Sequence, residues 1–146
     1  MKRLTFLLVC LFTLCATTLR ADNEKPIQVS QLPAAAQQFI KQHFADRKVA
    51  LAKVETELMS KSYEVIFADG DHIDFDSKGN WEKIDCKSSA VPTAAIPAQI
   101  MKYVRENYPD TTVKKIEKDR REYEVKLSNR IELSFDLKFN LIDIDM

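Results

Sequence analysis

The sequence predicts an α+β protein of two tandem repeats, each with one helix followed by about four antiparallel strands, and with the helices packed on one face of the sheet. Three observations predict this fold. The same residue types recur at a fixed offset, the apolar spacing changes from a helical to an alternating period in each repeat, and turn-forming residues separate the alternating segments.

The internal repeat begins with an offset of 64 residues and continues with an offset of 60. The first offset relates Leu32-Pro33 to Ile96-Pro97. The second offset relates four further pairs of segments: Tyr63-Glu64-Val65 and Tyr123-Glu124-Val125, Phe75-Asp76 and Phe135-Asp136, Asn80 and Asn140, and Ile84-Asp85 and Ile144-Asp145. Chance similarity would not keep one offset across four separate segments, so we expect two copies of one unit.

Each repeat is predicted to open with a helix, near residues 33–45 and 97–108. Pro33 and Pro97 suit the first position of a helix, where the missing N–H costs nothing. Apolar residues then follow at i, i+3, i+4 and i+8: Ala36, Phe39, Ile40 and Phe44 in the first helix, and Ile100, Tyr103, Val104 and Tyr108 in the second.

After each helix the apolar residues alternate with polar ones, which is typical of half-buried antiparallel strands. The alternation runs through Val54 to Leu58, Tyr63 to Phe67 and Ile73 to Phe75 in the first half, and through Tyr123 to Leu127, Ile131 to Phe135 and Ile142 to Ile144 in the second. Turn residues such as Asp69-Gly70 separate these segments. The predicted boundaries are 22–86 for the first repeat, 87–93 for a linker, and 94–146 for the second repeat.

Residues 1–21 have the composition of a signal peptide. Two basic residues precede an apolar run from Leu4 to Ala16, and this run is shorter than the roughly 20 residues that a membrane span needs. We therefore expect export, no membrane span, and cleavage after Ala21. Cleavage after Ala16 or Thr18 is the alternative.

The charge that remains after export argues against a nucleic-acid partner. Removing residues 1–21 takes away three basic residues and no acidic one, which leaves 19 basic and 22 acidic side chains and a formal charge of −3. Cys86 is then the only thiol, so no internal disulfide can form. We expect Cys86 to pack in the core, with an intermolecular disulfide as the alternative.

The residue inventory also argues against catalysis. The only two glycines, Gly70 and Gly79, lie in predicted turns, so no glycine-rich loop can hold a phosphate. His43 and His72 are the only side chains with an ordinary pKa near neutrality, and no serine or cysteine nucleophile lies near either in sequence. We expect no catalytic residues and no cofactor, apart from calcium in the alternative described below.

Trp81 is the residue that we expect to bind a partner. Strand alternation counted from Ile84 places Trp81 on the opposite, uncovered face, unless a bulge rotates it into the core. A partly exposed tryptophan on a sheet buries a large area on binding with little loss of entropy. His72, Asp74 and Lys83 are the expected neighbours of Trp81 in a partner site.

The segment from Asp74 to Asp85 has part of the spacing of a calcium-binding EF-hand loop. Acidic residues occupy positions 1, 3, 9 and 12, and glycine occupies position 6. However, Lys78 stands where an oxygen ligand is needed, and the flanking segments are predicted strands instead of helices. A β-hairpin with a Lys-Gly-Asn turn is the favoured interpretation, and a calcium site with Asp74, Asp76 and Asp85 as candidate ligands is the alternative.

The sequence resembles the PepSY-like proteins of the Bacteroidetes periplasm, also described as beta-lactamase-inhibitor-like. The residues that carry the resemblance are Ala21 to Ile27, the Leu-Pro opening of the helix, Asp69-Gly70 leading to Ile73-Asp74-Phe75-Asp76, and Gly79-Asn80-Trp81-Glu82-Lys83-Ile84-Asp85. The second half departs from the pattern, with Ser128-Asn129-Arg130 in place of Asp-Gly and Phe139 in place of the second glycine. The resemblance implies a periplasmic location and a repeated unit of one helix packed on a curved antiparallel sheet.

Two functions follow as expectations. The first is a secreted periplasmic, non-enzymatic binding module, inhibitor-like by analogy of fold, that contacts a protein or peptide through its sheet surface. The alternative is a calcium-responsive periplasmic protein that uses the acidic hairpins of the first repeat. The sequence does not identify the partner.

Overall fold

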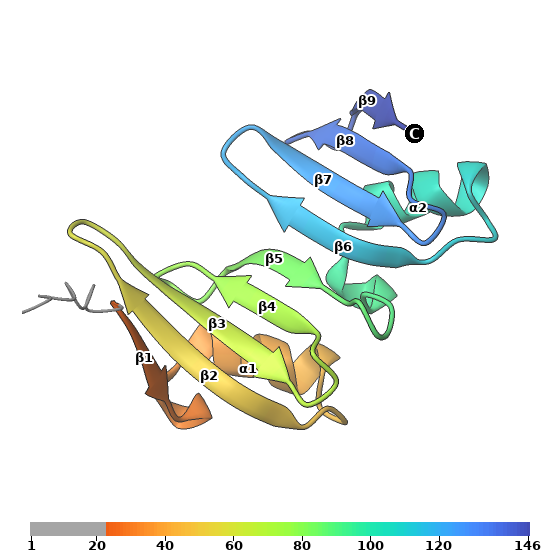
Figure 1. Cartoon of the computed structure of the whole chain (residues 1–146). Coiled ribbons are helices and arrows are strands. Elements are labelled where there is room, and N and C mark those ends of the chain that lie inside the picture. The colour runs from red at the N-terminus through yellow and green to blue at the C-terminus, as the bar shows by residue number, and fades with distance from the viewer. Residues whose placement is uncertain (1–22) are drawn as a thin grey trace, which may run out of the picture.

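The computed structural model describes residues 23–146, in which two α-helices and nine strands form an α+β fold (Figure 1). The first strand, β1 (Glu24–Ile27), is followed twice by one helix and four strands. The first set is α1 (Ala34–His43), β2 (Val49–Thr56), β3 (Lys61–Phe67), β4 (His72–Phe75) and β5 (Trp81–Asp85). The second set is α2 (Ala98–Asn107), β6 (Val113–Lys118), β7 (Glu122–Leu127), β8 (Glu132–Asp136) and β9 (Leu141–Asp145). The predicted signal peptide lies outside the described residues.

The nine described strands form one antiparallel sheet in which each strand pairs with its neighbours in chain order. One row of paired residues crosses all nine strands: Ile27, Ala52, Val65, Ile73, Ile84, Ile116, Val125, Leu133 and Ile144. The members from Val65 to Leu133 have no exposed surface. Both halves of the sheet therefore bury the same face.

The two helices cover this buried face, behind the sheet in the view of Figure 1. The Phe39 ring of α1 meets the Phe75 ring of β4 edge-on, with 6.0 Å between the ring centroids. Tyr103 of α2 meets Phe135 of β8 in the same way at 5.5 Å. The predicted helices and the antiparallel strands are confirmed, except that each helix-opening proline is the N-cap residue instead of the first helical residue.

The edge strand β1 brings the number of strands above the expected four for each helix. The sequence pattern does not predict β1, because its four residues are too few to show alternation and include a proline. Pro26 has no N–H to donate, and a proline of this kind is tolerated on an edge strand. β1 pairs with β2 along its whole length, from Glu24–Glu55 to Ile27–Ala52.

Hairpin turns in the two halves adopt the same left-handed backbone with different residues. Gly70 and Gly79 have φ angles of 89° and 86°. The residues 60 positions later, Arg130 and Phe139, have φ angles of 73° and 67°. The second half therefore keeps these turn conformations without glycine, although a side chain in this region costs about 1–2 kcal/mol.

We expect Arg130→Gly to raise the free energy of unfolding by about 1 kcal/mol, because glycine adopts a positive φ without steric cost. The Arg130 side chain is exposed, so its removal costs little packing. Urea unfolding measures the change. Arg121→Gly, in an exposed turn without a positive φ, is the matched control and should not stabilise the protein. Equal effects of the two substitutions would contradict the prediction.

Candidate functional site

The two halves of the sheet meet at β5 and β6, which pair over a short length. Three residue pairs join these strands: Lys83–Glu117, Ile84–Ile116 and Asp85–Lys115. No further pair of described residues joins β5 to β6, and the strands part toward Trp81 on one side and Lys118 on the other (Figure 1). By contrast, β2 and β3 share seven pairs.

A groove of about 1010 Å³ lies where β5 and β6 part. Three aromatic rings line it: Phe39 from α1, Trp81 from β5 and Tyr123 from β7. The ring centroids of Trp81 and Tyr123 are 6.4 Å apart, and the Lys118 ammonium lies 5.6 Å from the centroid of the Tyr123 ring. Charged side chains surround the rings: Asp74, Asp76, Glu82, Lys83, Glu117, Lys118, Asp119 and Arg120.

A β-bulge in β5 decides which face of the sheet carries Trp81. Lys83 pairs with Asp74, but it is Trp81, and not Glu82, that pairs with the fully buried Phe75. The extra residue rotates Trp81 onto the helix-covered face, where it is half-buried against the edge of the core. The expected placement of Trp81 opposite Ile84 is therefore wrong, and the alternative that a bulge turns the ring is correct.

The four predicted partner residues lie around two adjoining concavities. Trp81, Asp74 and Lys83 line the large groove. His72 instead lines a smaller hollow of about 230 Å³, which shares Asp74 and Lys83 with the groove. Glu82, the acidic residue at position 9 of the EF-hand spacing, lines both concavities and was not among the predicted partner residues. Burial raises the pKa of its carboxyl above the ordinary value, and the nearby Asp76 and Asp74 carboxylates raise it further.

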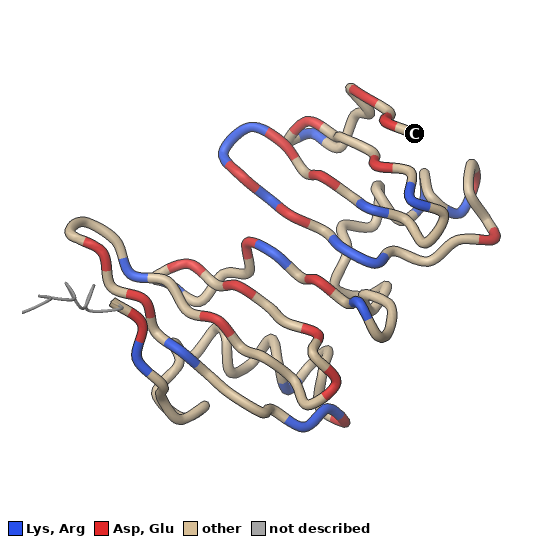
Figure 2. The backbone as a smooth tube through the Cα atoms, viewed as in Figure 1, with Lys and Arg blue, Asp and Glu red and all other residues tan. Residues whose placement is uncertain are grey.

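Acidic and basic residues occur along many strands of the sheet (Figure 2). Cross-strand ion pairs join Lys53 to Glu64 at 2.7 Å, Lys83 to Asp74 at 3.1 Å, and Lys126 to Glu132 at 3.1 Å. Ion pairs at the surface, whether partly or fully exposed, each contribute about 0–1 kcal/mol to stability. A partner that covered the face carrying these ion pairs would have to desolvate their charges, whereas the aromatic groove offers apolar surface.

The acidic residues with EF-hand spacing have separate structural roles. Asp76 closes the turn between β4 and β5, where its carboxylate accepts backbone N–H bonds from Lys78 at 2.8 Å and from Asn80 at 2.9 Å. Burial raises the pKa of Asp76, but these hydrogen bonds outweigh it and leave the pKa below its ordinary value. Asp74 pairs with Lys83, and Asp85 lies opposite His72. Asp136 makes the same bonds as Asp76 in the second half, so the turn by itself accounts for Asp76.

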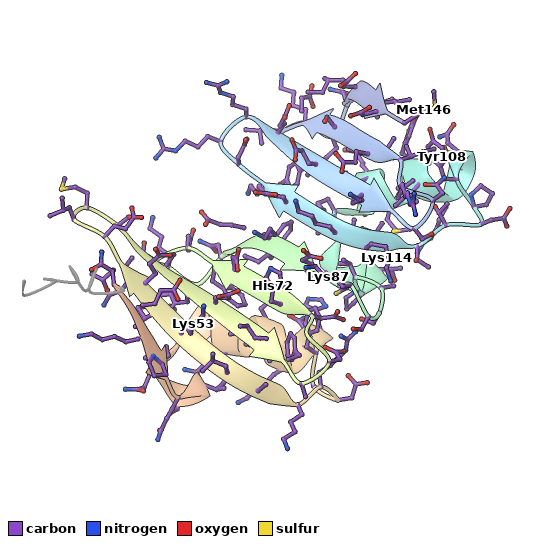
Figure 3. All side chains as sticks on the ribbon, in the orientation of Figure 1. Lys53, His72, Lys87, Tyr108, Lys114 and Met146 are labelled. Atoms are coloured by element: carbon purple, nitrogen blue, oxygen red, sulfur yellow. The ribbon has the colours of Figure 1, made fainter. Side chains whose placement is uncertain are left out.

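One group of three described side chains has a spacing suitable for a metal ion. Glu64, His72 and Asp74 each offer a ligand atom, and these atoms lie within 4.8 Å of one another. His72 lies on the front of the sheet in Figure 3, near Lys53. His72 and Asp74 were predicted from the sequence as partner residues, but Glu64 was not, because only the pairing of β3 with β4 places Glu64 opposite Asp74.

Asp71 is the only buried charged residue among those that the structure describes. Its carboxylate accepts hydrogen bonds from the Arg47 guanidinium at 2.8 Å, the Ser88 backbone N–H at 2.8 Å and the Ser89 hydroxyl at 2.5 Å. Arg47 also donates to Ser89 at 2.7 Å. This network connects the turn between β3 and β4 to the segment that joins the two halves. No pattern in the sequence predicted it.

Cys86 lies beside this network and is 1% exposed. Burial raises the pKa of its thiol to about 11. The expectation that Cys86 packs as a core residue is confirmed. The alternative of an intermolecular disulfide would require this buried thiol to reach the surface.

The fold and the groove define a class of protein: a small α+β chain with one antiparallel sheet, two helices on the same face, and a groove between the halves of the sheet. The chain belongs to the PepSY-like family. The model of this family, described as "Putative beta-lactamase-inhibitor-like, PepSY-like", matches residues 61–143. No described helix is long and apolar enough to cross a membrane.

Three solved structures of similar proteins come from Bacteroides species. One is a putative calcium-regulated periplasmic protein of Bacteroides thetaiotaomicron, which is 67% identical, with a TM-score of 0.83 over 86% of this chain and 99% of that chain. Another is a putative periplasmic protein of the DUF2874 family from Bacteroides vulgatus, which is 59% identical, with the same TM-score and coverage. A third, of unknown function and also from Bacteroides vulgatus, is 39% identical, with a TM-score of 0.78 over 84% of this chain and 99% of that chain. No curated protein matches the chain.

Proposed function

We propose that this protein is a periplasmic, non-enzymatic binding module that takes a segment of a protein or peptide into the groove between β5 and β6. The observation that carries the proposal is the aromatic lining of this groove by Phe39, Trp81 and Tyr123. Aromatic side chains in a concave site are typical anchors for a partner. The inhibitor-like description of the family supports the binding of a protein, and the periplasmic description of the relatives supports the location.

In this proposal the two sets of one helix and four strands are tandem repeats, and the groove is the opening between them. The pairing of Tyr63 with Phe75 in the first set matches that of Tyr123 with Phe135 in the second, 60 residues later. Phe39 and Trp81 belong to the first set, whereas Tyr123 comes from β7 in the second set. Both repeats are therefore needed for one binding site.

The groove favours an extended segment with an apolar anchor and basic flanks. Its rings supply apolar contact, while five acidic side chains outnumber three basic ones around them. Because no residue pair joins β5 to β6 beyond Lys83 and Glu117, the facing strand edges at Trp81 and Lys118 are open to backbone hydrogen bonds from an added strand.

We expect Trp81→Ala to weaken partner binding by at least about 30-fold, which corresponds to about 2 kcal/mol. The same change should cost about 2 kcal/mol of stability, less than the 3–5 kcal/mol of a fully buried aromatic residue, because Trp81 is half-buried. Urea unfolding measures the stability, and capture of proteins from periplasmic extract on the immobilised protein measures the binding.

Leu141→Ala is the matched control for this experiment. Leu141 pairs with Phe135 after a bulge, as Trp81 pairs with Phe75, but it does not line the groove. A protein retained by the wild type and by Leu141→Ala but lost by Trp81→Ala would support the proposal. Equal retention by both variants would overturn it.

Trp81 also provides a direct optical readout, because it is the only tryptophan in the chain. A peptide from the captured partner should shift the tryptophan emission as it covers the ring. A peptide that binds without any change in emission would place the contact outside the groove.

Calcium response is the second candidate function, favoured by the description of the 67% identical relative as calcium-regulated. Its candidate ligands in this chain are Asp74, Asp76 and Asp85. The same capture experiment in excess calcium and in chelator separates the two functions. Retention that needs calcium and is lost on Asp76→Asn, but not on Asp136→Asn, would favour the second.

A further inference from the structure

We propose a binding site for a transition-metal dication of the zinc type at Glu64, His72 and Asp74, on the uncovered face of the sheet. The pairing of β3 with β4 places Glu64 directly opposite Asp74, and His72 lies two residues before Asp74 on the same face. The ligand atoms of the three side chains already lie within 4.8 Å of one another, and all three residues are half-buried.

The ligand set favours zinc over calcium. Zn²⁺ binds imidazole nitrogen and carboxylate oxygen at about 2.0–2.2 Å, so its ligand atoms come to about 3.3 Å from one another in a tetrahedral site. Zinc binding would therefore draw the ligand atoms closer together than their present spacing of up to 4.8 Å. Ca²⁺ takes six to eight oxygen ligands, whereas one of these three ligands is an imidazole. Three protein ligands leave one zinc position for water or for a group from a partner.

The surroundings of the three ligands are suited to a cation. The hollow of about 230 Å³ beside them is lined by five carboxylates, from Glu24, Glu55, Glu64, Asp74 and Glu82, against two ammonium groups. A dication would lower this excess of negative charge. Asp85 lies opposite His72 in the strand register and adds another carboxylate beside the imidazole.

The two lysines of the hollow hold the carboxylate ligands in place. Lys53 lies 2.7 Å from Glu64, and Lys83 lies 3.1 Å from Asp74. Each lysine contacts one oxygen of its partner, and each carboxylate has a second oxygen for a metal. Partners of this kind orient metal ligands from outside the coordination shell. The site uses neither Asp76 nor the groove aromatics, and of its three ligands it shares only Asp74 with the groove. His72 and Glu64 do not line the groove, so zinc binding by His72 tests the site separately from the proposed function.

Titration of the purified protein with zinc chloride, followed by calorimetry and by competition with a zinc-sensitive dye, tests the site. We expect one zinc ion per chain. His72→Ala should weaken binding at least about 10-fold, as the loss of a single ligand or supporting residue does in other metal sites. Asp74→Asn should also weaken zinc binding at least about 10-fold. This second variant keeps the test valid if His72→Ala fails to fold.

His43→Ala is the matched control, because His43 and His72 are the only histidines in the chain. His43 lies on α1, with its ring tilted against that of Phe39 and 4.7 Å between the ring centroids. This variant should bind zinc like the wild type. The absence of saturable binding up to about 1 mM zinc, or equal affinity in the wild type and in His72→Ala, would overturn the site. Calcium that competes with zinc on equal terms would also overturn it, because the imidazole would then have no part in binding.

Discussion

Asp71→Ala is expected to lower the free energy of unfolding by about 3–5 kcal/mol, because it leaves the Arg47 guanidinium without its buried partner. The Asp71 side chain is 1% exposed, and that of Arg47 is 19% exposed. The change also leaves the Ser88 N–H and the Ser89 hydroxyl without their acceptor. Urea unfolding at neutral pH measures the loss.

Asp69→Ala is the matched control for Asp71→Ala. Asp69 contacts the same guanidinium at 3.2 Å, but its side chain is 37% exposed, so its loss should cost about 1 kcal/mol or less. Similar losses for the two variants would show that burial of the Asp71 carboxylate does not matter.

The contribution of Asp71 to the free energy of unfolding should also depend on pH. Burial raises the pKa of its carboxyl, but hydrogen bonds from Ser89, Ser88 and Arg47 outweigh it and leave the pKa below the ordinary value. A carboxyl with a lowered folded-state pKa stabilises the fold above its unfolded-state pKa of about 3.9 and loses this contribution as the pH falls. The difference in stability between the wild type and Asp71→Ala should therefore narrow in acid. An unchanged difference would mean that Asp71 is not ionised in the folded protein.

Gly79→Ala is expected to cost about 2–5 kcal/mol, from backbone strain and from a clash with the start of α1. A Cβ on Gly79 would lie 2.8 Å from the backbone nitrogen of Ala36 and 2.8 Å from the Cβ of Pro33. Neither atom is the end of a flexible side chain, so the turn and the helix would have to move apart. Because Gly79 and Ala35 line the groove, this shift should also weaken partner binding.

Gly70→Ala separates the two causes of this loss. Gly70 has nearly the same φ, 89° against 86°, but a Cβ on Gly70 would meet no atom within 4 Å. Its substitution should cost only the backbone strain of about 1–2 kcal/mol. An equal loss at Gly70 and Gly79, measured by urea unfolding, would show that contact with α1 does not limit the residue at position 79.

Much of the fold follows from local patterns in the sequence. The spacing of Phe39 and Ile40 on α1, and of Tyr103 and Val104 on α2, predicts each helix because residues three and four apart share one helical face. Alternation predicts the strands of both halves for the same kind of local reason. The edge strand β1 was not predicted, because its four residues are too few to show alternation and include Pro26.

The face of Trp81 shows where a local pattern is insufficient. Strand alternation assumes an unbroken register, and one extra residue, Glu82, moves every residue before it to the other face. Glu82 is left unpaired only when β5 pairs with β4. The order of apolar and polar residues along β5 does not predict this bulge. The sequence therefore identified Trp81 as a candidate anchor but placed it on the wrong face.

Helices, strands and turns could be predicted from the sequence because each depends on residues close together in the chain. Three features could not be predicted in this way. The first is the parting of β5 from β6, and the second is the burial of Asp71 against Arg47 and Ser89. The third is the close approach of Glu64 to His72 and Asp74. Each of these depends on which strands pair and in what register, and that outcome is settled by the packing of both halves around one core. The groove and the metal site therefore depend on the pairing of the strands, because their residues come from segments that only the folded chain brings together.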